Sequence, residues 1–142
     1  MNRGLLGMGW VIALVTLPLA GPLGQEGLAE AAERARAAWL RHDLAALFAA
    51  SDTVRLQLPG VPRSAALEPG QAARLLGRYV GAAREVTLEV VALRRAADDH
   101  GYAETERRFV IEGTADERLE TVFLGFRFVG GEWRVREVRV VP

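Results

Sequence analysis

The chain has no cysteine, no lysine and only two histidines among its 142 residues. Without cysteine it can form neither disulfides nor thiolate zinc sites, so the fold must be held by its apolar core. The 18 basic residues are all arginine, and 18 acidic residues balance them to a net charge of zero. A nucleic-acid-binding protein needs a clustered positive excess, so the composition argues against that function.

The sequence is instead rich in apolar residues, which make up 50% of the chain against 25% charged residues. This balance is typical of one packed globular domain and not of a disordered chain. The chain contains no internal repeat and no low-complexity tract. We therefore expect a single domain over residues 25–142.

The first two dozen residues have the order of a secretory signal peptide. Behind the single basic residue Arg3, the stretch from Leu5 to Leu17 is apolar, and Pro18 then breaks the helix before a series of small residues. The sequence predicts an exported protein, periplasmic or extracellular, in which residues 1–24 are the signal peptide. The alternative is an uncleaved membrane anchor, because the uncharged residues 4–24 are nearly long enough to span a bilayer.

The periodicity of the apolar residues predicts three helices and five strands. Helical spacing covers residues 25–41, 44–48 and 69–80, whereas alternation with period two covers 53–58, 85–94, 102–112, 118–129 and 132–141. Short turns join the last four strands and favour antiparallel neighbours. The apolar pattern changes face near Arg136–Glu137 and at Val90–Val91, which predicts bulges that bend the sheet. The expected fold class is α+β, with a curved antiparallel sheet packed on three helices as a cone.

Three stretches carry a resemblance to a known family: WLRHDLAALF at Trp39–Phe48, PGQAARLL at Pro69–Leu76 and GEWRVREVRV at Gly131–Val140. With the order of the elements, they resemble the cystatin-like, nuclear transport factor 2-like superfamily over residues 25–141. They are most similar to the uncharacterised domain-of-unknown-function 4783 family, which implies a small exported protein. These stretches are signatures of a fold and include no catalytic motif, although enzymes of the superfamily use carboxylates that line the cone.

Two histidines stand beside carboxylates, an arrangement that general acid–base catalysis uses. His42, however, lies at a helix end where a left-handed backbone is needed, and Asp43 can cap the next helix. His100 follows Asp98 and Asp99 in a turn that offers too few oxygen ligands for calcium. We interpret both groups as turn residues, and we expect no metal and no cofactor.

The face of the sheet that should meet the helices is predicted to be apolar. It comprises Val54, Leu56, Leu58, Val86, Leu88, Phe109, Ile111, Val122, Leu124, Phe126, Trp133 and Val135. Arg107 shares this face, Tyr79 adds a phenol from the third helix, and Asp52 is expected near the mouth of the cone. These three are the candidate ligand-binding residues. No residue is predicted to be catalytic, because the wall lacks a carboxylate or imidazole to act as a base.

The opposite face of the sheet is predicted to be charged. Glu104, Glu106 and Arg108 alternate on one strand, and Arg134 and Arg136 alternate on another. Such residues can form cross-strand ion pairs in solvent or a recognition stripe. Both interpretations are compatible with the sequence.

Three functions are compatible with this pattern. The one we predict is a non-catalytic binding or assembly module whose outer sheet face pairs with a second copy, as a homodimer, or with another partner. The alternatives are a carrier that holds a small apolar ligand in the cone, with Tyr79 or Arg107 as its polar handle, and a lyase, isomerase or hydrolase that uses Asp52, Tyr79 or Tyr102. No nucleic-acid partner is expected, and a membrane is a partner only if the N-terminal segment is retained.

The signal-peptide hypothesis predicts that export removes the N-terminus at a bond within residues 18–25, where small residues follow Pro18. Intact-mass measurement of the protein in the exported fraction checks this. Retention of residues 1–17 in that fraction would reject cleavage and favour the anchor.

Overall fold

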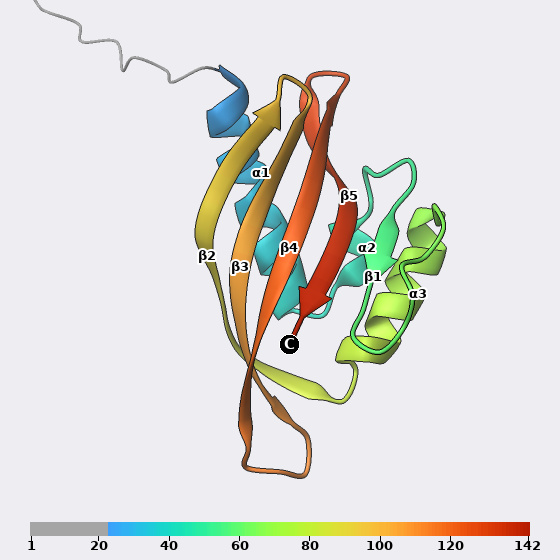
Figure 1. Ribbon diagram of the computed structural model, residues 1–142, viewed down its shortest axis with the longest axis vertical. Coiled ribbons are helices and arrows are strands. Elements are labelled where there is room, and N and C mark those ends of the chain that lie inside the picture. Colours follow the sequence, from blue (N-terminus) through green and yellow to red (C-terminus); the bar gives the residue numbers. More distant parts are fainter. Residues whose placement is uncertain (1–22) are drawn as a thin grey trace, which may run out of the picture.

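The computed structural model describes residues 23–142, which form three helices and a five-stranded sheet (Figure 1). In chain order the elements are α1 (Leu23–Leu40), α2 (Leu44–Leu47), β1 (Arg55–Gln57), α3 (Pro69–Val80), β2 (Ala83–Ala97), β3 (His100–Ile111), β4 (Glu117–Val129) and β5 (Glu132–Val141). This order confirms the α+β prediction. The proposed signal segment lies almost wholly outside the described residues and stays a prediction. No helix within residues 23–142 combines the length and apolar character needed to cross a membrane.

The strands follow the order β1-β5-β4-β3-β2, and β2 to β5 form the predicted antiparallel meander. Figure 1 shows α1 crossing one face of this curved sheet, with α2 and α3 beside β1. The strand β1, which lies outside the predicted meander, joins the sheet at one edge and pairs with β5 in parallel. The rule of short connections governs only neighbours in sequence, and β1 is separated from β5 by α3 and three strands.

Bulges interrupt the ladders and bend the sheet. The two predicted ones are confirmed: Val91 is skipped between the pairs that β2 makes with β3, and Arg136 is skipped between the pairs that β5 makes with β4. A further bulge at Val86, which the sequence pattern does not indicate, turns this side chain away from the helices and leaves it 42% exposed. The prediction that Val86 faces the helices is therefore wrong, and Glu85 faces inward instead.

The turn between α1 and α2 has the predicted geometry. His42 has a φ of 53° and is the one non-glycine residue with positive φ among residues 23–142. The Asp43 carboxylate accepts a hydrogen bond of 3.1 Å from the backbone N–H of Ala46, which caps α2. The positive φ of His42 and the cap provided by Asp43 together allow the chain to reverse direction within two residues.

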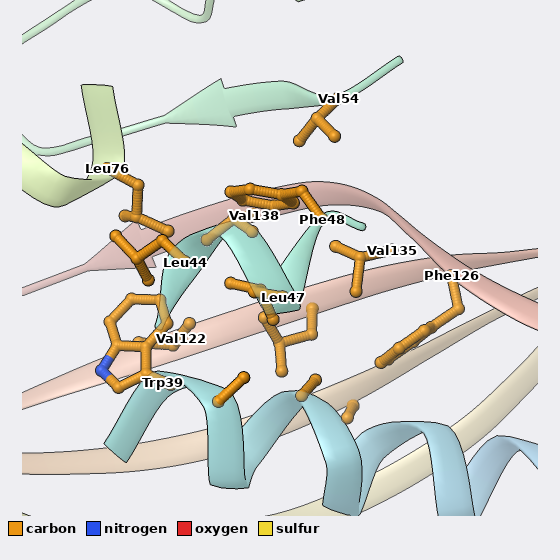
Figure 2. Close-up of a cluster of buried hydrophobic side chains, with 14 of the residues drawn as sticks. Trp39, Leu44, Leu47, Phe48, Val54, Leu76, Val122, Phe126, Val135 and Val138 are labelled. Carbon is orange, nitrogen blue, oxygen red and sulfur yellow. The ribbon is translucent and has the colours of Figure 1, made fainter. Parts of the chain in front are cut away.

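An apolar core lies between the helices and the sheet, and it includes Trp39, Phe48, Leu76 and Trp133. Figure 2 shows Leu76 of α3 directed toward Leu44 of α2, above Trp39 of α1. Leu76 is fully buried, whereas its neighbour Leu75 is 39% exposed. Leu75 lies outside the buried stripe because the inward face of α3 is narrow: Ala72, Leu76 and Val80, each four residues apart, fill it.

The contrast between Leu75 and Leu76 gives a test of this packing. Leu76→Ala is expected to lower the free energy of unfolding by about 2 to 5 kcal/mol, because it leaves a cavity in a closed core. Leu75→Ala removes the same atoms from the same helix and should cost less than about 1 kcal/mol. Thermal or denaturant unfolding of both variants measures the difference, and equal losses would show that α3 does not pack as described.

Candidate functional site

A network of buried charged side chains lies inside the cone, centred on Arg107 of β3. Arg107 is only 1% exposed. Its Nη1 donates to Oε1 of Glu120 at 2.7 Å, and its Nε donates to Oε2 of Glu85 at 2.9 Å. Its Nη2 donates to Oε1 of Glu85. The guanidinium is thus held between one carboxylate from β2 and one from β4, the strands on either side of β3.

Two further side chains complete the network from the helical layer. The Tyr79 hydroxyl at the end of α3 donates to Oε2 of Glu120. The Nε2–H of His42 donates to Oε1 of Glu85 at 3.0 Å. The side chains of Glu85 and Glu120 are 3% and 7% exposed, whereas that of His42 is 30% exposed. His42 is therefore more accessible to solvent than either carboxylate.

The surroundings fix the protonation of two members. Burial lowers the pKa of Arg107, but the hydrogen bonds and charges of Glu85 and Glu120 outweigh burial and raise it above its ordinary value. Burial raises the pKa of Tyr79 well above its ordinary value, and the hydrogen bond to Glu120 adds to this effect. At neutral pH Arg107 is charged and Tyr79 is a neutral donor.

Few polar atoms of the network remain free to bind or react with a substrate. Each of the four carboxylate oxygens of Glu85 and Glu120 already accepts at least one hydrogen bond. The Arg107 guanidinium also lies 3.9 Å from the centre of the Phe109 ring and 5.4 Å from that of Trp39, distances typical of cation–π contacts. A general base must present an oxygen or nitrogen to its substrate. This arrangement serves instead to tie three strands to the ends of α1 and α3.

The structure brings together two of the three residues predicted to bind a ligand. Tyr79 and Arg107 both belong to the network, each bonded to Glu120. Asp52 does not: its side chain is 79% exposed, and its nearest cation is Arg134, at 3.7 Å. A ligand-binding role for these three residues stays a prediction.

The prediction that the cone wall lacks a carboxylate and an imidazole is wrong, since Glu85, Glu120 and His42 all reach the network. Glu120 shares the period-two pattern of the buried residues Val122 and Leu124, so the sequence contained the signal for it. Glu85 had no such signal, because the bulge at Val86 reverses the faces of β2 at that point.

A cavity elsewhere in the cone does not reach the network. It has a volume of about 660 Å³ and opens between Gly27 of α1 and the aromatic side chains of Phe128 and Trp133 near the β4–β5 turn. Arg107 lies toward the other end of the sheet, opposite Glu120 near the start of β4. The expected polar handles for an apolar ligand, Tyr79 and Arg107, are therefore not part of this cavity.

The outer face of the sheet has an uncharged centre. Between Glu117 and Arg127, the outward residues of the middle strand β4 are Leu119, Thr121, Phe123 and Gly125. Charged residues flank them: Glu104 of β3 pairs with Phe123 on one side, and Arg139 of β5 pairs with Phe123 on the other. The Arg139 guanidinium lies 4.6 Å from the centre of the Phe123 ring. We call Glu104, Phe123 and Arg139 the outer-face triplet.

A hollow of about 330 Å³ adjoins the outer-face triplet. Its walls are Tyr102, Phe123, Glu137 and Arg139, with Gly125 between them. A Cβ atom at Gly125 would stand 3.2 Å from Cβ of Glu137, so glycine allows the strands their close approach and leaves the hollow open. The outer face therefore combines half-buried aromatic side chains and the exposed side chain of Leu119 with a recess, features typical of interaction surfaces.

Comparison with proteins of known structure identifies the fold. No protein-family model matches the sequence, and no curated protein matches it by sequence. Solved structures do match. A domain-of-unknown-function 4783 protein from Bacteroides uniformis is 14% identical with a TM-score of 0.64, covering 77% of this chain and 94% of its own. A ketosteroid isomerase-like protein from Erwinia carotovora atroseptica is 17% identical with a TM-score of 0.69, covering 84% and 96% respectively.

A third structure, of a protein from Streptomyces avermitilis in the nuclear transport factor 2-like family, is 15% identical with a TM-score of 0.64 and covers 84% of this chain and 96% of its own. The chain therefore has the nuclear transport factor 2-like fold, as the sequence resemblance implied, and its similarity to domain-of-unknown-function 4783 proteins is confirmed at the level of structure. At these identities the likeness shows the fold alone, and one fold serves many functions.

The buried network predicts unequal effects for two adjacent arginines. Arg107→Ala should lower the free energy of unfolding by about 3 to 5 kcal/mol, because it leaves two buried carboxylates without their cation. Arg108, on the outer face, is 45% exposed in its side chain and pairs with Glu106 and Glu117, so Arg108→Ala should cost less than about 1 kcal/mol. Denaturant unfolding of the two variants checks this, and similar small losses would mean that the network contributes nothing to stability.

Proposed function

We propose that this protein is an exported, non-catalytic assembly module whose partner is a second copy of the same chain, bound through the outer face of the sheet. The observation that supports this most strongly is the outer-face triplet. An acidic residue, an aromatic residue and a basic residue lie in one row across three strands, with the aromatic residue in the middle. Such a row is complementary to itself.

The symmetry of a dimer explains why the row matters. A twofold axis parallel to β4 would place the Phe123 side chains of the two copies opposite each other. The same axis would place Glu104 of each copy opposite the partner's Arg139. Sheets that pack face to face stand about 10 Å apart, a distance that glutamate and arginine side chains can bridge together.

Neighbouring rows fit the same axis. Tyr102 and Glu137 both pair with Gly125, so the axis would place the phenol of each copy opposite the partner's Glu137 carboxylate. Leu119, further along β4, is 56% exposed and would meet its own copy. The centre of the contact would thus be uncharged and its rim charged, the usual composition of a protein interface.

The interior of the cone supports a non-catalytic role. A reaction like that of an isomerase needs a base that faces its substrate, and the ketosteroid isomerase-like structure shares only the fold with this chain. In the buried network the carboxylates of Glu85 and Glu120 are both bonded to Arg107, and the phenol of Tyr79 is bonded to Glu120. The network therefore favours assembly over catalysis.

Charge reversal across the triplet tests this proposal. Glu104→Arg and Arg139→Glu should each weaken self-association by about 10-fold or more, since each brings like charges together twice in a symmetric dimer. The double variant Glu104→Arg/Arg139→Glu exchanges the charges and should restore association to within about 3-fold of the original, if each pair contributes mainly through its charges. Sedimentation velocity over a concentration series measures the dissociation constants.

Glu33→Arg provides the matched control, because Glu33 is an exposed residue of α1 on the helical side of the sheet. It should leave association unchanged. Pairing through this face would be contradicted if the double variant associated more weakly than both single variants. It would also be contradicted if the natural chain stayed monomeric at millimolar concentration.

A further inference from the structure

Three arginines gather at the end of the outer face where β4 turns into β5. Arg127 and Arg134 are direct partners in the antiparallel ladder, and Arg136 is the residue at the bulge of β5. Like charges directly opposite each other destabilise a strand pair. An anion bound near this local excess of cations would relieve their mutual repulsion.

The carboxylates near these arginines compensate only in part. Arg134 lies 3.1 Å from Glu132 and 3.7 Å from Asp52, but the two carboxylate side chains are 52% and 79% exposed, and such pairs contribute little. Within residues 23–142, neither Arg127 nor Arg136 lies within ion-pair distance of a carboxylate, although the charge of Asp99 interacts with that of Arg127 at longer range. Both guanidinium groups therefore keep donors free for an external anion.

The position of Arg136 is fixed by the imidazole of His100. Nη1 of Arg136 donates to Nε2 of His100 at 2.7 Å, and Nδ1–H of His100 donates to Oδ1 of Asp99 at 2.6 Å. Bulges commonly re-aim a side chain, and the bulge at Arg136 directs this one toward the same hollow as its two neighbours. The imidazole uses one of the five N–H groups of the guanidinium.

The hollow has the size of a small anion. Its volume is about 90 Å³, and its walls include the three arginines, Asp52 and Thr53. This is about three times the roughly 30 Å³ that a water molecule occupies in the liquid. One guanidinium group can donate two parallel hydrogen bonds to two oxygens of the same phosphate. The Thr53 hydroxyl offers one more donor.

We propose that Arg127, Arg134 and Arg136 form a binding site for a phosphate group, either as inorganic phosphate or as the phosphoryl group of a larger molecule. Asp52 is then a competitor within the site, because its carboxylate occupies the position on Arg134 that a phosphate oxygen would take. The distance of 3.7 Å and the exposure of this carboxylate make it easy to displace. The site is separate from the outer-face triplet and from the buried network.

The test is a titration of the protein with inorganic phosphate at constant ionic strength, followed by calorimetry or amide chemical shifts. Arg127→Gln and Arg136→Gln should each weaken binding by about 10-fold or more, as expected for loss of a charge-assisted hydrogen bond. Asp52→Asn should strengthen binding, because the competing charge is gone. Arg84→Gln removes a cation from the start of β2, remote from the hollow, and should leave the affinity unchanged.

Two further arms identify the source of the phosphate. A soluble phosphate monoester and vesicles that contain an anionic phospholipid are titrated with the same four variants, and a dependence on Arg136 in either arm supports a site for that ligand. Saturable binding should persist in Glu104→Arg, which is designed to be monomeric and leaves the hollow itself unchanged, so failure of the proposed dimer and failure of the phosphate site are distinguishable. The proposal is overturned if no arm shows saturable binding, if Arg84→Gln weakens binding as much as Arg136→Gln, or if Asp52→Asn weakens it.

Discussion

The burial of one guanidinium inside the cone is the constraint on which the rest of the structure depends. Arg107 cannot be buried alone, because an unpaired charge in an apolar interior costs several kcal/mol. Glu120 supplies one carboxylate at the directly opposite position of β4, and Glu85 supplies the second only because β2 bulges at Val86. The exposure of a valine at that bulge is thus explained by the need to bring a carboxylate inward.

The same network determines where the protein can interact. With both carboxylates saturated by Arg107, Tyr79 and His42, the interior of the cone presents no free base at this position. The groups that remain available lie on the other side of the sheet. There the uncharged side chains of β4 are flanked by residues of opposite charge, and the arginines near the β4–β5 turn surround a small hollow. Both proposals follow from this division between a saturated buried network and an open outer face.

Much of the fold could be predicted from the sequence, because it depends on local periodicity. The pattern of apolar and turn residues indicates the three helices and the meander. It also indicates the bulges at Val91 and Arg136 and the left-handed turn at His42. The parallel pairing of β1 with β5 is not indicated by this pattern, since it joins segments far apart in sequence.

The buried network could be predicted only in part. Arg107 and Glu120 share the alternation of their strands, but the inward position of Glu85 depends on a bulge that the ladder with β3 imposes. The partners of Tyr79 and His42 depend on how the ends of α3 and α1 sit on the sheet. A period-two pattern places side chains on a face, but it does not reveal which of them will meet.

The absence of cysteine from the chain allows a direct measurement of how the outer face is used. Thr121 of β4 lies between Leu119 and Phe123 on this face, and a cysteine placed there would stand near the proposed twofold axis. With a short bis-maleimide, Thr121→Cys should form a covalent dimer at low protein concentration, whereas a cysteine at the exposed loop residue Ala66 should not. Addition of Glu104→Arg should suppress the dimer. Equal cross-linking at positions 121 and 66 would contradict the account.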